Sequence, residues 1–286
     1  MESRRLLALY AHPDDEILGP GGAIALYASQ GAQVELVVAT RGEAGEIADP
    51  ALATPETLPQ VREQELRCSA ETLGIRQVTF LGYRDSGMAG TAENQDPRAY
   101  MNSDPDEVVP RLVEIIRRLQ PQVILTFEPF GGYGHPDHQT IHKHALLAVT
   151  AAADPDCRPD LGQAWDTPRL FYPLVRRPTW LAMKERMAAR GLDVSFFVGL
   201  EERREQGWPD DQFHVTLDVS AAMGQKLAAF RCHATQFGAE SIFRQLPEEE
   251  MAEILRYEYF ALARPTPPPG LHLTDLFAGW EAAPAA

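Results

Sequence analysis

The chain has 286 residues, of which 44% are hydrophobic and 23% charged, and this ordinary globular composition excludes a disordered, collagen-like or disulfide-scaffold protein. With 26 basic and 41 acidic residues the net charge is −15, which argues against nucleic acid as a partner because an acidic surface repels phosphate. No stretch approaches the roughly 18 apolar residues of a membrane helix, so the sequence predicts no membrane partner and a cytoplasmic location.

Short apolar runs alternate with segments of helical periodicity through the first half of the chain. The runs predict buried strands over residues 6–10, 34–39, 78–81 and 123–126. The periodic segments predict helices over residues 21–30, 61–73, 104–119 and 138–152. Such alternation is typical of right-handed βαβ units, so we predict a single α/β domain built on a Rossmann-like, mostly parallel sheet flanked by helices.

Further elements are predicted in the second half, where strands are expected over residues 169–174 and 213–217 and helices over residues 221–232 and 248–262. Residues 176–211 are charged and irregular, which fits an insertion or a lid. The tail from Pro265 is rich in proline and is expected to be extended or mobile. We therefore place one domain at residues 1–264 and a Pro-rich tail at residues 265–286.

The cysteines are Cys68, Cys157 and Cys232, an odd number with wide spacing and no C-x-x-C pair. This pattern argues against a zinc ribbon and against a disulfide framework. We therefore expect three buried free thiols in a reducing cytoplasm.

The loop after the first predicted strand reads Ala11-His12-Pro13-Asp14-Asp15-Glu16, with one imidazole and three carboxylates. In open α/β sheets ligands bind outside the carboxyl ends of the strands, so this loop is a candidate binding site. Crowded carboxylates repel one another, and a divalent cation would offset that repulsion. An acidic cap on the following helix explains the three carboxylates equally well, but it leaves His12 unexplained.

The loop after the strand at 123–126 ends in Gly131-Gly132-Tyr133-Gly134-His135-Pro136-Asp137-His138. Two histidines that flank Pro-Asp at the end of a second strand favour a metal site over incidental surface residues. Together His12, Asp15 and His138 can provide two imidazoles and one carboxylate, which suits zinc held by three protein ligands with a fourth position for water. Hydrolysis of an amide or an ester is the chemistry that such a centre supports.

Two other patterns compete with this interpretation. His138 and His142 have the i, i+4 spacing of zinc proteases, but Gln139 stands where their motif has glutamate, so we expect His142 and His144 to lie at the surface or behind the ligands. The run at residues 19–22 (GPGG) lacks the third glycine of a dinucleotide-binding motif, and the acidic cluster before it would repel a pyrophosphate. The sequence thus disfavours a nicotinamide cofactor.

The two loop motifs together resemble the PIG-L/LmbE-like family of zinc-dependent N-acetylglucosamine deacetylases, and the resemblance runs from the first strand to about Phe237. Three further segments look like the branch that acts in mycothiol and bacillithiol biosynthesis, namely residues 82–88 (GYRDSGM), 132–134 (GYG) and 233–236 (HATQ). Members of this branch deacetylate N-acetylglucosaminyl-inositol or N-acetylglucosaminyl-malate, or cleave mycothiol S-conjugates. The resemblance implies one zinc ion per chain, with His12, Asp15 and His138 as its ligands and Asp14 as the general base for the attacking water.

The resemblance also implies roles for five other residues. His135 would be the general acid or the electrostatic partner of the tetrahedral intermediate, and Asp137 would orient it. Tyr133 would help to hold the developing oxyanion. Arg62 and Asp85 would bind the substrate, although a solvated helix face for Arg62 and a turn for Asp85 are the alternatives.

The sequence thus predicts an enzyme that hydrolyses the acetamido group of a small N-acetylglucosaminide and releases acetate. An amidase of thiol S-conjugates with the same zinc chemistry is one alternative, and a non-catalytic sugar- or nucleotide-binding protein on the same scaffold is another. The expected partner is a small amino sugar, and the oligomeric state is open, a homo-oligomer included. Glu43 and Glu46 are expected to be solvated, with a place in the lining of the sugar pocket as the alternative. A buried structural role competes with a site role for His233.

Overall fold

The computed structural model describes residues 4–197, 208 and 210–279. Its strands are β1 (Arg5–Tyr10), β2 (Gln33–Val38), β3 (Gln77–Phe80), β4 (Val123–Leu125), β5 (Arg169–Leu174), β6 (Val215–Asp218) and β7 (Tyr257–Arg264). Its helices are α1 (Asp15–Leu18), α2 (Gly21–Ser29), α3 (Leu58–Leu73), α4 (Pro105–Leu119), α5 (Pro136–Ala153), α6 (Arg177–Ala189), α8 (Met223–Cys232), α9 (Ile242–Gln245) and α10 (Glu248–Ile254).

All of these strands belong to one sheet with the order β3-β2-β1-β4-β5-β7-β6. Strands β1 to β5 pair in parallel, and β7 runs antiparallel to both β5 and β6. The chain moves from β1 to β2 and β3 on one side and returns to β4 on the other side of β1. This arrangement confirms the predicted α/β class, and it makes the β1–β4 boundary the switch point at which such sheets bind ligands.

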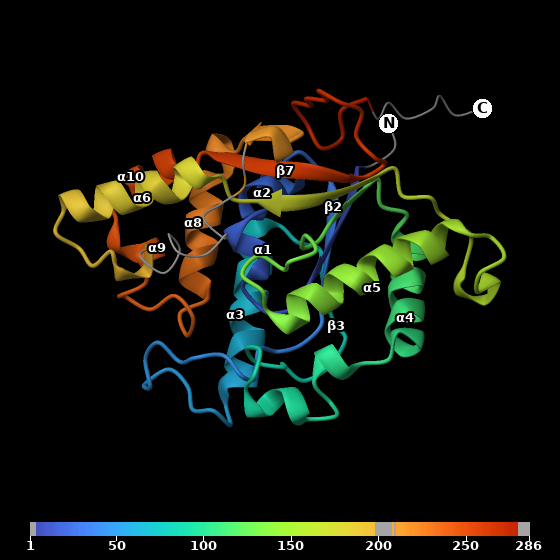
Figure 1. Ribbon diagram of the computed structural model, residues 1–286, viewed down its shortest axis with the longest axis horizontal. Helices are drawn as coiled ribbons and strands as arrows, with labels where there is room; N and C mark the ends of the chain where they lie inside the picture. Colours follow the sequence, from blue (N-terminus) through green and yellow to red (C-terminus); the bar gives the residue numbers. More distant parts are fainter. Residues whose placement is uncertain (1–3, 198–207, 209, 280–286) are drawn as a thin grey trace.

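Helices cover both faces of the sheet (Figure 1). Along β1, Leu6, Ala8 and Tyr10 pack into the core shared with α2, α3 and α8. Leu7 and Leu9 point the other way and pack against α4 and α5. Because side chains of a strand alternate between faces, a strand covered on both sides needs an unbroken apolar sequence, which is what β1 has.

The helix predicted over residues 248–262 is wrong in its second half. Helix α10 ends at Ile254, and the chain continues as β7 between β5 and β6. Within β7, Glu258, Phe260 and Leu262 are buried while their neighbours are less so, a period of two that suits a strand. The three glutamates at the start of α10 favour a helix start there, which agrees with the first half of the predicted helix.

The stretch expected to be an irregular insertion or lid contains helix α6. Met183 and Met187 lie one turn apart on this helix and are buried in the core, so α6 is part of the domain's packing. Residues 198–207 and 209, which the expectation also covered, lie outside the described residues. In the expected tail, Leu276 and Phe277 are buried, and the Leu276 N–H donates to the Tyr27 hydroxyl at 2.9 Å. Leu276 and Phe277 thus pack against α2, whereas most of residues 265–270 are exposed.

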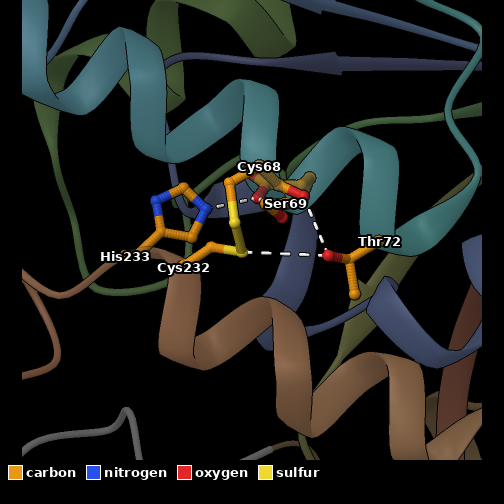
Figure 2. The surroundings of a disulfide bond; sticks show 6 residues. Cys68, Ser69, Thr72, Cys232 and His233 are labelled. Atoms are coloured by element: carbon orange, nitrogen blue, oxygen red, sulfur yellow. Dashed lines mark hydrogen bonds and ion pairs between the residues drawn. A yellow bond between two sulfur atoms is a disulfide. The ribbon is translucent and has the colours of Figure 1, made fainter.

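The expectation of three buried free thiols is wrong, because Cys68 of α3 and Cys232 of α8 form a disulfide. Figure 2 shows this bond between the two helices, with Ser69 and His233 beside it. The two cysteines are 164 residues apart in the sequence, so no local pattern indicates their pairing. Cys157 is free and only partly buried. The described helices include none long and apolar enough to span a membrane.

Removing this disulfide should lower the stability of the protein. The Cys68→Ser/Cys232→Ser double variant opens a loop of 164 residues, and loss of a native disulfide typically costs about 2–5 kcal/mol of unfolding free energy. Denaturant unfolding of both proteins measures the difference, and Cys157→Ser is the matched control that should unfold like the wild type. A wild-type midpoint that dithiothreitol leaves unchanged would contradict the stabilising role.

Candidate active site

The sequence-predicted ligands come together at the carboxyl ends of β1 and β4. His12 follows β1 by two residues, Asp15 is the first residue of α1, and His138 lies in the first turn of α5. His12 Nδ1 is 3.1 Å from His138 Nε2, Asp15 Oδ1 is 3.3 Å from His138 Nε2, and Asp15 Oδ2 is 3.7 Å from His12 Nδ1. Ligand atoms on a tetrahedral zinc ion with bonds of about 2.0–2.1 Å lie roughly 3.3 Å apart. His138 Nε2 has this spacing from both His12 Nδ1 and Asp15 Oδ1, while the contact between Asp15 and His12 is made through the other carboxylate oxygen.

The hydrogen bonds of the two imidazoles indicate which nitrogens are free for a metal. His138 Nδ1 lies 3.0 Å from the Gly131 carbonyl oxygen, so the proton of the neutral ring is on Nδ1. His12 Nε2 lies 3.2 Å from Asp137 Oδ2 and 3.5 Å from Asp85 Oδ1, which places the proton of that ring on Nε2. The remaining lone pairs, on His12 Nδ1 and His138 Nε2, therefore face each other at 3.1 Å. Two facing lone pairs repel, and either a proton on His12 Nδ1 or a cation between the two nitrogens removes that repulsion.

The electrostatics of the site also favour positive charge. Burial disfavours the charged imidazole of His12, but the carboxylates of Asp85 and Asp137 outweigh it and raise the pKa of His12 well above its usual value. Burial also opposes ionisation of Asp15, yet His138 and His12 hold the pKa of that carboxyl well below its usual range. A divalent cation would supply the positive charge that this arrangement favours.

His135 is a second candidate ligand, since its ring, His12 and His138 place one nitrogen each within 4.8 Å of one another. However, His135 Nδ1 accepts the backbone N–H of Asp137 at 3.2 Å and caps helix α5. The proton of the neutral ring is therefore on Nε2, which makes that atom a hydrogen-bond donor. Burial and the neighbouring imidazoles lower the pKa of His135 to about 4, so the ring is neutral at pH 7.

His12, Asp85 and Asp137 form another group with metal-binding spacing. Here the carboxylates already have donors. Asp137 accepts from the hydroxyl and the backbone N–H of Ser86, and Asp85 accepts from backbone N–H groups, that of Gly87 at 2.8 Å among them. Asp15 also accepts backbone N–H groups, those of Ala11 and His12, but through Oδ2, which leaves Oδ1 beside His138 Nε2. Zinc binding by His12, Asp15 and His138 stays a prediction. The carboxylate of Asp137 contacts His12 and Ser86, whereas the resemblance assigned it to orienting His135.

Asp14 points away from its neighbour Asp15. Its backbone has φ 108°, in the left-handed region that residues other than glycine rarely adopt. Its carboxylate accepts from Arg62 Nη2 at 3.0 Å. Burial raises the pKa of Asp14 to about 6, an increase that the Arg62 guanidinium limits. The structure thus separates two adjacent carboxylates, one beside the imidazoles and one beside an arginine.

Arg62 lies on α3, and its side chain is buried instead of lying on a solvated helix face. Besides Asp14, its guanidinium donates to the carbonyl oxygens of Pro13 at 2.6 Å and Gly42 at 2.9 Å. Gly42 has a positive φ, and a Cβ atom there would collide with the guanidinium. Asp85 is also buried, 3% exposed, and lies near the Nε2 atoms of His12 and His135. Substrate binding by Arg62 and Asp85 stays a prediction.

Tyr133 lies on the glycine-rich loop and is half-exposed, with its ring centre 5.1 Å from that of His138 and 6.0 Å from that of His135. Glu128 holds this loop, since its carboxylate accepts the N–H groups of Phe130 and Gly132. Glycine is required at position 131 because a Cβ atom there would lie 2.7 Å from His138 Cβ. The loop therefore brings a phenol to the mouth of the site without disturbing a candidate ligand.

Two histidines and two glutamates expected outside the ligand set differ in their burial. His142 and His144 are both buried, with Nδ1 of His142 2.8 Å from the Phe127 carbonyl and Nδ1 of His144 3.0 Å from the Tyr100 hydroxyl. Glu43 contradicts the expectation of a solvated side chain, because it accepts the Asp85 N–H at 3.0 Å. Glu46 is exposed, as expected.

The sequence analysis missed three residues that shape the site. Ser86 donates to Asp137, Glu128 organises the glycine-rich loop, and Glu16 accepts the Asp14 N–H. Glu16 was visible as the last acidic residue of the first motif, but its partners were not. Ser86 and Glu128 each follow a predicted strand by a few residues, and that position was the available signal.

The chain has named relatives across nearly its whole length. A 1D-myo-inositol 2-acetamido-2-deoxy-alpha-D-glucopyranoside deacetylase of Geodermatophilus obscurus is 41% identical over 273 residues, which cover 92% of each chain. An N,N'-diacetylchitobiose deacetylase structure from Pyrococcus horikoshii matches with a TM-score of 0.61 at 24% identity, over 96% of this chain and 87% of that one. A 4-carboxy-2-hydroxymuconate hydratase structure from Pseudomonas putida matches with a TM-score of 0.62 at 22% identity, over 94% and 99%.

The two solved structures show the fold alone at such low identity, and one of them is a hydratase, so the fold does not fix the reaction. The PIG-L family, described as GlcNAc-PI de-N-acetylase, matches residues 7–149, which include both loop motifs. The family match and the 41% identical relative together establish that the chain belongs to the PIG-L family.

Proposed function

We propose that this protein is a zinc-dependent N-deacetylase that removes the acetyl group of a small N-acetylglucosaminide, releasing acetate and a free glucosamine amine. The observation that carries the proposal is the convergence of two imidazole nitrogens and one carboxylate, beside a second carboxylate that is held separately. A non-catalytic sugar- or nucleotide-binding protein needs neither feature.

His12, Asp15 and His138 would hold one zinc ion per chain, on the grounds of their spacing and their tautomers. When bound, zinc polarises an amide carbonyl and lowers the pKa of a water molecule at its open position. The protein's own contribution is to fix the two rings, through Asp137 and the Gly131 carbonyl, so that their free nitrogens face one point.

Asp14 would take the proton of the attacking water. Its pKa of about 6 leaves it ionised at neutral pH, and Arg62 holds its carboxylate apart from the ligand set. A base whose pKa lies just below the working pH is ionised and still accepts a proton readily. The protonated carboxyl group can then return that proton to the departing amine.

His135 and Tyr133 would stabilise the negative charge that develops on the amide oxygen. The neutral ring of His135 keeps its proton on Nε2, which makes it a hydrogen-bond donor and a poor proton source. We therefore assign His135 the electrostatic role and not that of the general acid. The phenol of Tyr133 is half-exposed beside this ring and would be a second donor.

The name of the Geodermatophilus relative supports N-acetylglucosaminyl-inositol as the substrate. That name describes an N-acetylated glucosamine linked to inositol, and the relative covers 92% of this chain at 41% identity. The similarity favours inositol over malate as the aglycone, and mycothiol over bacillithiol biosynthesis as the setting. Arg62 and Asp85 would bind the sugar.

A substrate panel tests the proposal. Zinc-loaded protein is incubated with N-acetylglucosaminyl-inositol, N-acetylglucosaminyl-malate, chitin oligomers and a thiol S-conjugate while free amine is followed. We expect kcat/KM to be highest for the inositol conjugate. Release of amine only from the S-conjugate would instead establish the alternative amidase activity. No release from any compound would refute the proposed enzymatic function.

The cytoplasmic location and a small amino sugar as the partner are further parts of the proposal, and the oligomeric state stays open. The boundary between a domain at residues 1–264 and a tail at 265–286 stays a prediction as well.

A further inference from the structure

Glu16 is a buried carboxylate that the proposed mechanism does not use. It follows Asp15 in α1, it is 0% exposed, and both of its oxygens have partners. Oε2 accepts the Asp14 N–H at 2.9 Å, while Oε1 accepts the Ser69 hydroxyl at 2.5 Å and lies 2.7 Å from His233 Nε2. Burying a carboxylate is costly unless it is hydrogen-bonded, so each of these three partners is needed to keep Glu16 in the interior.

The partner of Glu16 is the backbone of the candidate base. Asp14 has φ 108°, a conformation that an aspartate rarely adopts without support from its surroundings. This conformation turns the Asp14 side chain toward Arg62. The Asp15 carboxylate points away from Arg62 and accepts the N–H groups of Ala11 and His12.

We propose that Glu16 is a positioning residue that fixes Asp14 in this left-handed conformation, so that the Asp14 carboxylate stays beside Arg62 and out of the ligand set. The inference rests on the proposed function, in which Asp14 is the base. Without the Glu16 acceptor, the Asp14 N–H would be left without its partner, and the backbone would relax toward the usual region with φ below zero.

Helix α3 holds both ends of this arrangement. Arg62 and Ser69 are seven residues apart, which is about two helical turns, so they lie on the same side of the helix. Arg62 binds the carboxylate of Asp14, and Ser69 binds Glu16, which in turn holds the Asp14 backbone. One rigid element thus sets the position of the base from two directions.

His233, another partner of Glu16, is held beside α3 by the disulfide bond. His233 directly follows Cys232, and Ser69 directly follows Cys68, so the disulfide lies one residue away from each partner (Figure 2). His233 is 0% exposed, and its Nδ1 has no hydrogen-bond partner in the described part of the chain. Its contact with Glu16 is therefore the hydrogen bond that orients the ring.

Two substitutions of Glu16 test the proposal. Glu16→Leu removes the acceptor of the Asp14 N–H and should lower kcat by roughly 10–100-fold. This is the usual loss when a residue that hydrogen-bonds to a catalytic group is removed. KM and zinc content should stay near wild-type values, since no ligand or substrate contact changes. Glu16→Gln keeps an oxygen for the Asp14 N–H and should restore most of kcat. Equal loss in both variants would overturn the proposal.

Glu258 provides a matched control. It is a buried carboxylate that accepts the N–H groups of Gly22 and Ala23 at 2.7 Å and pairs with Lys226 at 2.6 Å. Glu258→Leu should lower stability, as Glu16→Leu does, while kcat per folded, zinc-loaded protein stays unchanged. A similar fall of kcat in both would indicate a general packing effect and overturn the positioning role.

The Asp14→Asn background separates positioning from other effects. A residue that acts only through Asp14 should cause no further loss of kcat once Asp14 is replaced, whereas independent effects multiply. If Glu16→Leu does not fold, Ser69→Ala removes one partner of Glu16 and should give the same pattern with a smaller effect. A full additional loss in the double variant would contradict the proposal.

A crystal structure of Glu16→Leu gives a readout that does not depend on activity. We expect φ of Asp14 to leave the left-handed region and its carboxylate to leave Arg62. An unchanged Asp14 would overturn the positioning role even if the wild type is an active deacetylase. A wild type without activity would refute the proposed function, and this structure would still decide the role of Glu16.

Discussion

Replacing Asp14 by asparagine should leave zinc bound and lower kcat by roughly 10²–10⁴-fold, the usual worth of a positioned general base. The ligand set stays intact because the Asp14 carboxylate contacts Arg62 and not the two ligand imidazoles. Asparagine has nearly the same shape but cannot take a proton from water. Steady-state kinetics and metal analysis of the same preparation measure both effects.

The pH dependence gives a second readout for the same variant. The pKa of Asp14 is about 6, so the base is ionised above that pH, and kcat should fall as the pH drops through it. A bound cation stabilises the ionised carboxylate of Asp14 and therefore shifts this acidic limb of the pH–rate profile to lower pH. The limb should be absent in Asp14→Asn. A variant that keeps the wild-type limb would show that another group is the base.

Replacing Asp15 by alanine should release most of the metal. The variant loses one of three protein ligands, and we expect a loss of zinc affinity larger than the roughly 10–100-fold that removal of an outer partner causes. Activity should fall in proportion to zinc content and recover in part at high zinc concentration. Metal content after dialysis against a weak chelator measures the change.

Asp15→Asn is the matched control for structural damage. Asp15 accepts the backbone N–H groups of Ala11 and His12, and asparagine keeps an acceptor for them while it removes the negative charge. This variant should also lose zinc affinity although the loop is preserved. If Asp14→Asn emptied the site while both Asp15 variants kept their zinc, the roles of the two residues would have to be exchanged.

The parallel part of the fold could be predicted because it depends on local patterns. Residues 6–10 form an unbroken apolar run, and the structure has β1 at Arg5–Tyr10 with both faces covered. The prediction of a helix was wrong over residues 257–262, where pairing with β5 and β6 decides for a strand. Tertiary pairing thus outweighed local propensity in β7, which lies between two other strands.

The grouping of His12, Asp15 and His138 could also be predicted, because the carboxyl ends of β1 and β4 are neighbours at the switch point. Their role as zinc ligands remains a prediction. The partners that orient them could not be predicted, since Ser86 and Asp137 are 51 residues apart and meet only through tertiary packing. The same reason applies to Glu16 and His233, which are 217 residues apart.

The most direct test of the account follows acetate release from N-acetylglucosaminyl-inositol while zinc is returned to chelator-treated protein. We predict no activity without metal and a linear rise that ends at one zinc ion per chain, the stoichiometry that His12, Asp15 and His138 support. Full activity of the metal-free protein, or a rise that ends at a different stoichiometry, would contradict the account.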